Sequence, residues 1–145
     1  MKALARIIMP LLLRLDDIVT KCINRVAIPY DGGVHAKHRL MQYHQFFVTR
    51  VKPGERVLDI GSGYGAVAYS LATQAGAFVT GIDLNANNIA KAKAKFHHPN
   101  LSFVHGDART SLPAGAWDVV VLSNILEHLE QRIPFLTDIQ RHLLS

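Results

Sequence analysis

A short apolar run that ends in three closely spaced glycines is the feature that most constrains the fold of this chain. Residues 57–60 are Val-Leu-Asp-Ile, and residues 61–65 are Gly-Ser-Gly-Tyr-Gly. A brief apolar run closed by glycines is typical of a buried parallel strand. Glycines at that point let the backbone turn sharply and approach a ligand closely, and the next helix offers free N–H groups. The segment therefore predicts a strand, a ligand-binding loop and a helix in succession.

The same alternation of strand and helix continues along the rest of the chain. The pattern predicts strands over residues 57–60, 77–82, 101–105 and 118–123, and helices over residues 65–75, 86–96 and 127–144, the last of them adjusted at Pro134. Strands that alternate with helices imply a parallel sheet with right-handed crossovers. The predicted fold class is α/β, with a doubly wound and mostly parallel sheet of which the first four strands are present, preceded by N-terminal helices.

The first 52 residues lack this alternation. Residues 1–28 are rich in apolar side chains and predict one or two helices, and residues 29–33 have the composition of a turn. A further helix is predicted from about residue 36 to residue 51. We therefore expect an N-terminal helical extension or cap over residues 1–52, and a ligand-binding domain over residues 53–145.

The extreme N-terminus resembles a signal peptide, because a basic residue precedes an apolar run. Arg14, Asp16 and Asp17 close that run and no small-residue cleavage site follows, so a signal peptide is not predicted. The apolar run is also far too short to span a bilayer. A helix that lies on a membrane or covers a pocket is an alternative, while packing against the domain's own core is the simpler interpretation.

Basic residues are concentrated in the same N-terminal part. The net charge is +5, with ten Lys and Arg against four Asp and Glu up to Arg56, and six against seven from Val57 onward. Such a bias can mark a surface for phosphate, nucleic acid or anionic lipid. Solvated helices explain it more simply, and no aromatic-and-basic RNA-binding motif accompanies it. The single cysteine, Cys22, allows no internal disulfide, so a reducing compartment is expected.

Polar residues follow the predicted strands at the ends where ligands bind in such sheets. The second strand ends in Asp83-Leu84, the third is followed by Asp107-Ala108, and the fourth by Asn124. A carboxylate at Asp83 lies 22 residues after Gly61 and suits the two hydroxyls of a ribose. The glycine spacing alone is also compatible with a nicotinamide dinucleotide. These residues predict a ligand that contains adenosine.

Asp59 discriminates between the two kinds of adenosine ligand. It lies two residues before Gly61, inside the first predicted strand. A carboxylate there would repel the doubly negative pyrophosphate of a dinucleotide, whereas it would attract a sulfonium ligand with an ammonium group. Asp59 therefore favours the sulfonium ligand.

In combination, these motifs resemble those of the class I S-adenosylmethionine-dependent methyltransferases. Residues 57–65, the strand end at Asp83, Asp107-Ala108 and residues 118–129 are similar to that family's motifs in order and spacing. The resemblance covers residues 38–145, and it implies a Rossmann-like fold with S-adenosyl-L-methionine as cofactor. The cofactor-binding residues that it implies are Asp59, Gly61, Ser62, Gly63 and Gly65 around the methionine part, Asp83 with its neighbour Leu84 at the ribose end, Asp107 and Ala108 at the adenine, and Asn124 beside the methyl group.

Glu127 and His128 come shortly after Asn124. Some members of the family that methylate phenolic lipids or RNA ends use a Glu-x-x-Glu-His cluster as a metal site, but Asn124 replaces the first carboxylate here. Two side chains alone would hold a hard cation weakly, so no metal site is predicted. Glu127 is interpreted as an acid in the first turn of the last helix, and His128 as a candidate catalytic base near the substrate pocket.

The resemblance implies transfer of a methyl group to an unidentified acceptor, a small-molecule or lipid-like compound and not a nucleic acid. An in-line displacement at a sulfonium methyl depends mainly on alignment, so no catalytic triad is expected. Members of the family continue with a fifth strand and an antiparallel hairpin, so the chain is expected to be truncated at its C-terminus. The alternatives are an NAD(P)-dependent oxidoreductase and a non-catalytic or incomplete methyltransferase-like domain. The expected location is cytoplasmic, with peripheral membrane contact as an option.

Overall fold

The computed structural model describes residues 43–143 together with residues 8–10, 12, 14–16, 18, 19, 21 and 22. The chain divides into two compact units, Met1–Tyr43 and His44–Ser145. In the first unit, every described residue between Ile8 and Cys22 is helical. The helix predicted over residues 36–51 begins outside the described residues, and its described part is α3, Tyr43–Val48. Its predicted end is wrong by three residues, because Thr49 and Arg50 form a turn.

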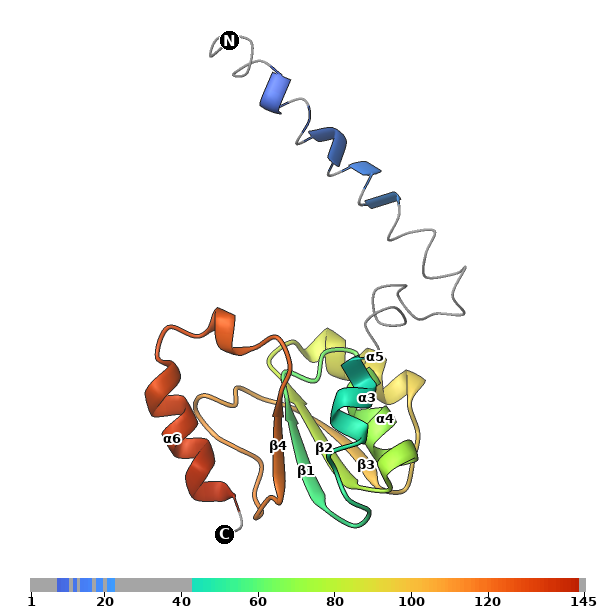
Figure 1. The fold of residues 1–145 in the computed structure, drawn as a ribbon, viewed down its shortest axis with the longest axis vertical. Helices are drawn as coiled ribbons and strands as arrows, with labels where there is room; N and C mark the ends of the chain where they lie inside the picture. The colour runs from blue at the N-terminus through green and yellow to red at the C-terminus, as the bar shows by residue number, and fades with distance from the viewer. Residues whose placement is uncertain are drawn as a thin grey trace. The chain divides into compact units, whose positions relative to one another are not determined.

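The second unit is built on a parallel sheet whose described strands are β1 (Arg56–Ile60), β2 (Phe78–Asp83), β3 (Leu101–His105) and β4 (Val119–Leu122). Their order is β3-β2-β1-β4 (Figure 1). The predicted strands are confirmed to within one residue at each end. The chain runs outward from β1 to β3 and then returns to the other side of β1. Strand order therefore reverses between β1 and β4, and ligands bind such sheets at the carboxyl ends of the strands at this point.

Helices cover both faces of the sheet, as a doubly wound fold requires (Figure 1). On one side lie α4 (Ala66–Ser70), its π-helical continuation η1 (Leu71–Ala75) and α5 (Ala86–Lys95). On the opposite side lies α6 (Arg132–His142). The predicted helices over residues 65–75 and 86–96 are confirmed, although the second half of the first has π-helical geometry.

An apolar core fills the space between the sheet and α6. It consists of Leu58, Ile60, Ile82, Trp117, Phe135 and Ile139. Side chains alternate between the two faces of a strand, so Asp59, between Leu58 and Ile60, points to the side of α4. Burial of each large apolar side chain contributes about 1.5–3 kcal/mol. Packing therefore fixes the position of the central strand β1, and with it the start of the loop that follows.

The helix predicted over residues 127–144 is wrong in its first part. The structure has a 3-10 helix η2 (Leu126–His128), an irregular link, and then α6 from Arg132. Pro134 explains the break, because its ring would clash with the carbonyl of Glu130 if the helix ran through both. Proline is tolerated in the first turn of a helix, so α6 begins just before it.

Candidate functional site

The loop after β1 is fixed by hydrogen bonds to the end of β2. Gly61 N and Ser62 N both donate to Ile82 O, at 2.8 and 3.0 Å, and Gly65 N donates to Ser62 O at 2.8 Å. Gly61, Gly63 and Gly65 have φ values of 71°, 54° and 81°. Glycine adopts this left-handed region without strain, whereas most other residues do not. The glycine pattern is therefore a requirement of the loop's backbone.

The three glycines differ in what surrounds them. A Cβ on Gly61 would overlap the end of the Ile125 side chain, and a Cβ on Gly65 would overlap the Phe103 ring. A Cβ on Gly63 would meet nothing within 4 Å. Gly61 and Gly65 thus allow close packing inside the protein, whereas Gly63 borders open space at the carboxyl edge of the sheet.

Asp59 is a buried carboxyl group whose surroundings disfavour its ionised form. Its side chain is 1% exposed, and within the described part of the chain its Oδ2 has no hydrogen-bond partner. Burial and, secondarily, the charge of Asp83 raise the pKa of Asp59 to about 7, against a lowering effect of a backbone hydrogen bond from Ala68. Ser62 Oγ is likewise buried without a partner among the described residues. Two polar atoms beside the glycine loop therefore lack the partners that buried polar atoms normally have.

Asp83 connects the glycine loop to the start of α5. Its Oδ2 accepts from Gly63 N at 2.8 Å, and its Oδ1 accepts from Asn85 N at 2.8 Å and from Asn88 Nδ2 at 3.1 Å. A carboxylate offers about four acceptor positions, so the described residues leave one position open, on Oδ2. The sequence interpretation missed Asn85 and Asn88. Asn85 could have been recognised as a helix cap, because asparagine is favoured at that position. In the structure its side chain accepts a hydrogen bond from Asn87 N.

Asp107, by contrast, is fully engaged by its neighbour Arg109. The Arg109 Nε and Nη2 atoms reach both carboxylate oxygens, with a shortest distance of 2.6 Å, and Arg109 N donates to Oδ1 at 2.9 Å. These hydrogen bonds lower the pKa of Asp107 to about 2. Arg109 was not predicted as a site residue, because its pairing with Asp107 depends on a side-chain rotamer that the sequence does not specify.

A cavity of about 180 Å³ brings many of the predicted site residues together. Gly61, Asp83, Leu84, Asp107, Ala108 and His128 all line it. Asp59, Ser62, Gly63, Gly65 and Asn124 do not line it. Its other walls are mainly apolar and include Ile82, Ile125, Leu129 and Phe135. Its size and apolar walls suit a flat heterocycle with polar groups at one edge. An adjoining cavity of about 590 Å³ shares Asp107, Arg109 and His128.

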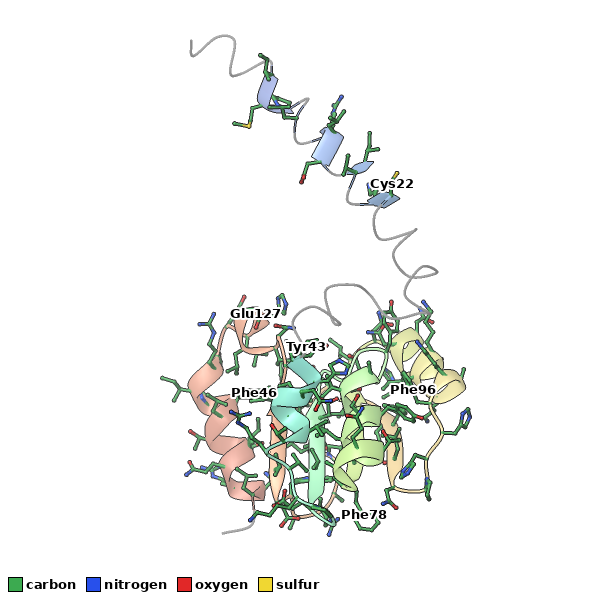
Figure 2. The ribbon with its side chains drawn as sticks, turned by 45° about the vertical axis from the view of Figure 1, so that its right-hand side comes forward. Cys22, Tyr43, Phe46, Phe78, Phe96 and Glu127 are labelled. Carbon is green, nitrogen blue, oxygen red and sulfur yellow. The ribbon has the colours of Figure 1, made fainter. Side chains whose placement is uncertain are left out.

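The segment after β4 exposes Asn124, Glu127 and His128, and its backbone adopts an unusual conformation at Asn124. Asn124 has φ of 55°, the only positive value of a non-glycine residue among the described residues. Glu127 lies in η2 and not in the first turn of α6, which corrects the sequence interpretation. Figure 2 shows Glu127 at the end of the domain opposite to Phe78, the first residue of β2, so it lies at the carboxyl edge. Across the described residues, no three His, Cys, Asp or Glu side chains gather as a metal site.

The family whose model matches this chain is described as a methyltransferase domain, over residues 57–145. The chain is 33% identical over 118 residues to the mitochondrial ubiquinone biosynthesis O-methyltransferase of Schizosaccharomyces pombe, a match that covers 74% of this chain and 43% of that protein. It is 34% identical over 110 residues to the fatty-acid O-methyltransferase of Mycolicibacterium smegmatis, with 74% and 40% covered.

Among solved structures, the fold is similar to that of a TehB-like S-adenosylmethionine-dependent methyltransferase from Corynebacterium glutamicum. The TM-score is 0.60 at 29% identity, and the match covers 69% of this chain and 55% of that one. The chain thus spans less than half the length of the two curated relatives named above.

Proposed function

Since the chain belongs to the class I S-adenosylmethionine-dependent methyltransferases, we propose that it binds S-adenosyl-L-methionine and serves methyl transfer to a small acceptor. The observation that carries this proposal is Asp59, a buried carboxyl group beside the glycine loop with an oxygen that lacks a partner in the described part of the chain. A ligand with a cationic ammonium group would supply the missing partner, whereas a pyrophosphate would not.

The residues around the site fit the other parts of this cofactor. The apolar cavity of about 180 Å³ suits the adenine, with Leu84, Asp107 and Ala108 on its wall. The open acceptor position on Asp83 Oδ2 suits one ribose hydroxyl, and a second would have to displace Asn88 from Oδ1. To accept a hydrogen bond from the adenine, Asp107 would have to bind Arg109 and the adenine together or give up its contact with Arg109.

Gly61, Ser62, Gly63 and Gly65 would hold the methionine part, and Asn124 would lie beside the methyl group. Bound there, the cofactor would supply a sulfonium methyl group for in-line displacement. This chain's own contribution would be to position the two reactants, which is where most of the rate enhancement of such a reaction arises.

His128 is the proposed base for an acceptor that carries a proton when it attacks. Its exposed ring lines both cavities. Loss of a general base lowers the rate by about 10²–10⁴-fold. A His128→Ala variant that methylates the true acceptor at the wild-type rate would dismiss this role.

The acceptor is proposed to be lipid-like. Support comes from the two relatives, whose names specify ubiquinone biosynthesis and a fatty acid. We further propose a cytoplasmic location with peripheral membrane contact, consistent with a single cysteine, Cys22. Within the described residues, none of the helices has the length and hydropathy needed to cross a bilayer. The division into a helical extension (residues 1–52) and a cofactor domain (residues 53–145) is part of the same proposal.

Calorimetric titration of the whole chain with S-adenosylhomocysteine, and separately with NADH, tests the cofactor assignment. The matched variants are Gly63→Ala and Gly54→Ala. Both glycines have positive φ, 54° and 85°, and a Cβ on either would meet nothing within 4 Å. Both variants should therefore lose similar stability, about 1–2 kcal/mol, through backbone strain alone.

We expect the wild-type chain and Gly54→Ala to bind S-adenosylhomocysteine and not NADH, and Gly63→Ala to bind at least tenfold more weakly. Equal affinities of the two variants for S-adenosylhomocysteine would show that Gly63 does not contact the ligand. Preference for NADH, or no binding by a chain whose circular dichroism shows it to be folded, would contradict the proposal.

A further inference from the structure

Arg109 occupies the acceptor positions of Asp107 that an adenine would need. The backbone N and Nε of Arg109 donate to Oδ1, and Nε and Nη2 donate to Oδ2, at distances between 2.6 and 3.2 Å. A carboxylate offers about four acceptor positions, so these contacts use them all. The Arg109 side chain is 57% exposed, and little packing therefore opposes its rotation away from Asp107.

Glu130 provides a second carboxylate close to Arg109. Both residues line the cavity of about 590 Å³, whereas Glu130 does not line the smaller cavity proposed for the adenine. The hydrogen bonds and the charge of Asp107 raise the pKa of Arg109, and the charge of Glu130 adds to this effect. The guanidinium group is therefore already attracted by Glu130 while it is bound to Asp107.

The acids of this larger cavity differ in whether they have a partner. Asp107 is held by Arg109, and Asp138 Oδ1 lies 4.0 Å from Arg141 Nη1. In the described part of the chain, neither a hydrogen bond nor an ion pair engages the Glu130 carboxylate. Glu130 can thus accept Arg109 without giving up another contact.

The position of Glu130 follows from the break before α6. It lies in the irregular link between η2 and α6, because the ring of Pro134 prevents a helix from running through its carbonyl group. This link forms part of the cavity wall, opposite the loop that carries Asp107 and Arg109 in the sequence. The break therefore brings an exposed acid to the cavity that Arg109 borders.

We propose that binding of the adenine moves the Arg109 guanidinium from Asp107 to Glu130. The inference rests on the proposed function, since it requires an adenine at Asp107. The adenine amino group then donates to Asp107, and Glu130 replaces the ion-pair partner that Arg109 loses. A base with an oxygen in place of the amino group cannot donate to the carboxylate, so it leaves the pair of Asp107 and Arg109 intact. Arg109 and Glu130 together favour a base that carries an amino group.

Calorimetric titration of the full chain with S-adenosylhomocysteine and with S-inosylhomocysteine, whose base has an oxygen in place of the amino group, tests the exchange. Glu130→Gln should bind S-adenosylhomocysteine about two- to fivefold more weakly than wild type, the range for loss of one exposed ion pair. It should bind S-inosylhomocysteine as wild type does. The difference should shrink as salt is raised from about 0.05 to 0.5 M.

Asp138→Asn is the matched control, because it neutralises another acid of the same cavity, and it should bind both ligands as wild type does. The double variant Arg109→Ala/Glu130→Gln should bind S-adenosylhomocysteine as tightly as Arg109→Ala alone, because no guanidinium remains to move. Circular dichroism verifies that each variant is folded.

Equal affinities of Glu130→Gln and wild type for S-adenosylhomocysteine would overturn the exchange and leave the proposed function intact. A loss of the same size for both ligands, or one that persists in the Arg109→Ala background, would also contradict it, since Glu130 would then act without Arg109. Absence of S-adenosylhomocysteine binding by the folded wild-type chain would refute the proposed function and the exchange with it.

Discussion

Asp59 and Asp107 are both carboxylates of the proposed cofactor site, in opposite surroundings. Asp59 is 1% exposed, and burial raises its pKa to about 7. Asp107 is paired with Arg109, whose hydrogen bonds lower its pKa to about 2. At neutral pH the first therefore exists as a mixture of protonated and ionised forms, and the second is fully ionised.

The two ends of the proposed cofactor site therefore offer a ligand different electrostatic surroundings. No described residue around Asp59 offers a partner to its buried Oδ2, which is unfavourable for folding and favourable for a cationic ligand. Around Asp107 the protein has supplied the cation itself, so a ligand must exchange with Arg109. A positively charged ligand group should bind favourably beside Asp59. A ligand group at Asp107 should bind only by replacing part of the contact between Asp107 and Arg109.

The largest expected effect is a pH-dependent stabilisation by Asp59→Asn. The folded-state pKa of Asp59 is raised from 3.8 to about 7, so its contribution to stability is fully present below pH 4 and is lost as the pH rises through 7. The asparagine side chain carries no charge, so the variant should be more stable than wild type at pH 8 by roughly 2–4 kcal/mol. Urea unfolding at pH 8 and at pH 4.5 measures the difference, which should shrink at the lower pH.

A constant difference between the two pH values would mean that Asp59 does not titrate in this range. Asp118→Asn serves as a comparison, since Asp118 is exposed and lies at the amino end of β4.

The next effect concerns ligand binding by the same group. An ammonium ligand binds the ionised form of Asp59, so the affinity for S-adenosylhomocysteine should rise about tenfold per pH unit up to about pH 7 and then level off. Calorimetry between pH 5.5 and 8 would show the slope. Asp59→Asn should bind more weakly at pH 8 and show no slope. A slope that survives in the variant would assign the titration to another group.

A smaller effect is expected at the other end of the site, where Arg109→Ala removes the partner of Asp107. The melting temperature should change little, since exposed ion pairs contribute little to stability. The affinity for S-adenosylhomocysteine should rise severalfold, because the adenine no longer competes with Arg109. Arg109→Lys keeps the charge and should behave like wild type. A weaker affinity in the alanine variant would show instead that Arg109 orients Asp107 for the ligand.

The smallest effect is local strain at Asn124. Its φ of 55° is tolerated by asparagine and glycine but not by alanine. Asn124→Ala should therefore be about 1 kcal/mol less stable than Asn124→Gly in denaturant unfolding. Equal stabilities of the two variants would indicate that the backbone there relaxes without strain.

The order and type of the elements from β1 to β4 could be predicted because each strand is a compact apolar run and each turn is marked by glycine or a polar residue. The last helix was placed wrongly because apolar periodicity continues across residues 126–131, whereas Pro134 prevents a helix from running through Glu130. The periodicity was the stronger signal in the sequence, and the steric requirement of the proline decided the structure.

For the candidate site, sequence patterns located the carboxylates but not their partners. Gly61, Asp83, Leu84, Asp107 and Ala108 line one cavity, as the strand ends suggested. That Arg109 engages Asp107, and that Asn88 occupies Asp83, depends on side-chain rotamers that no spacing rule specifies. Burial of Asp59 followed from its place in a central strand, but its lack of a partner emerges only when the surrounding atoms are placed.

The hydrogen bonds that shape the glycine loop also set the order in which this region can form. Gly61 N and Ser62 N donate to Ile82, and Gly63 N donates to Asp83, twenty residues further along the chain. The loop therefore acquires its shape only after β2 has paired with β1, a closure across a nonlocal segment that slows folding. During synthesis, the nascent loop must remain unstructured until Asp83 has left the ribosome, so a translational pause before that residue would prolong its exposure.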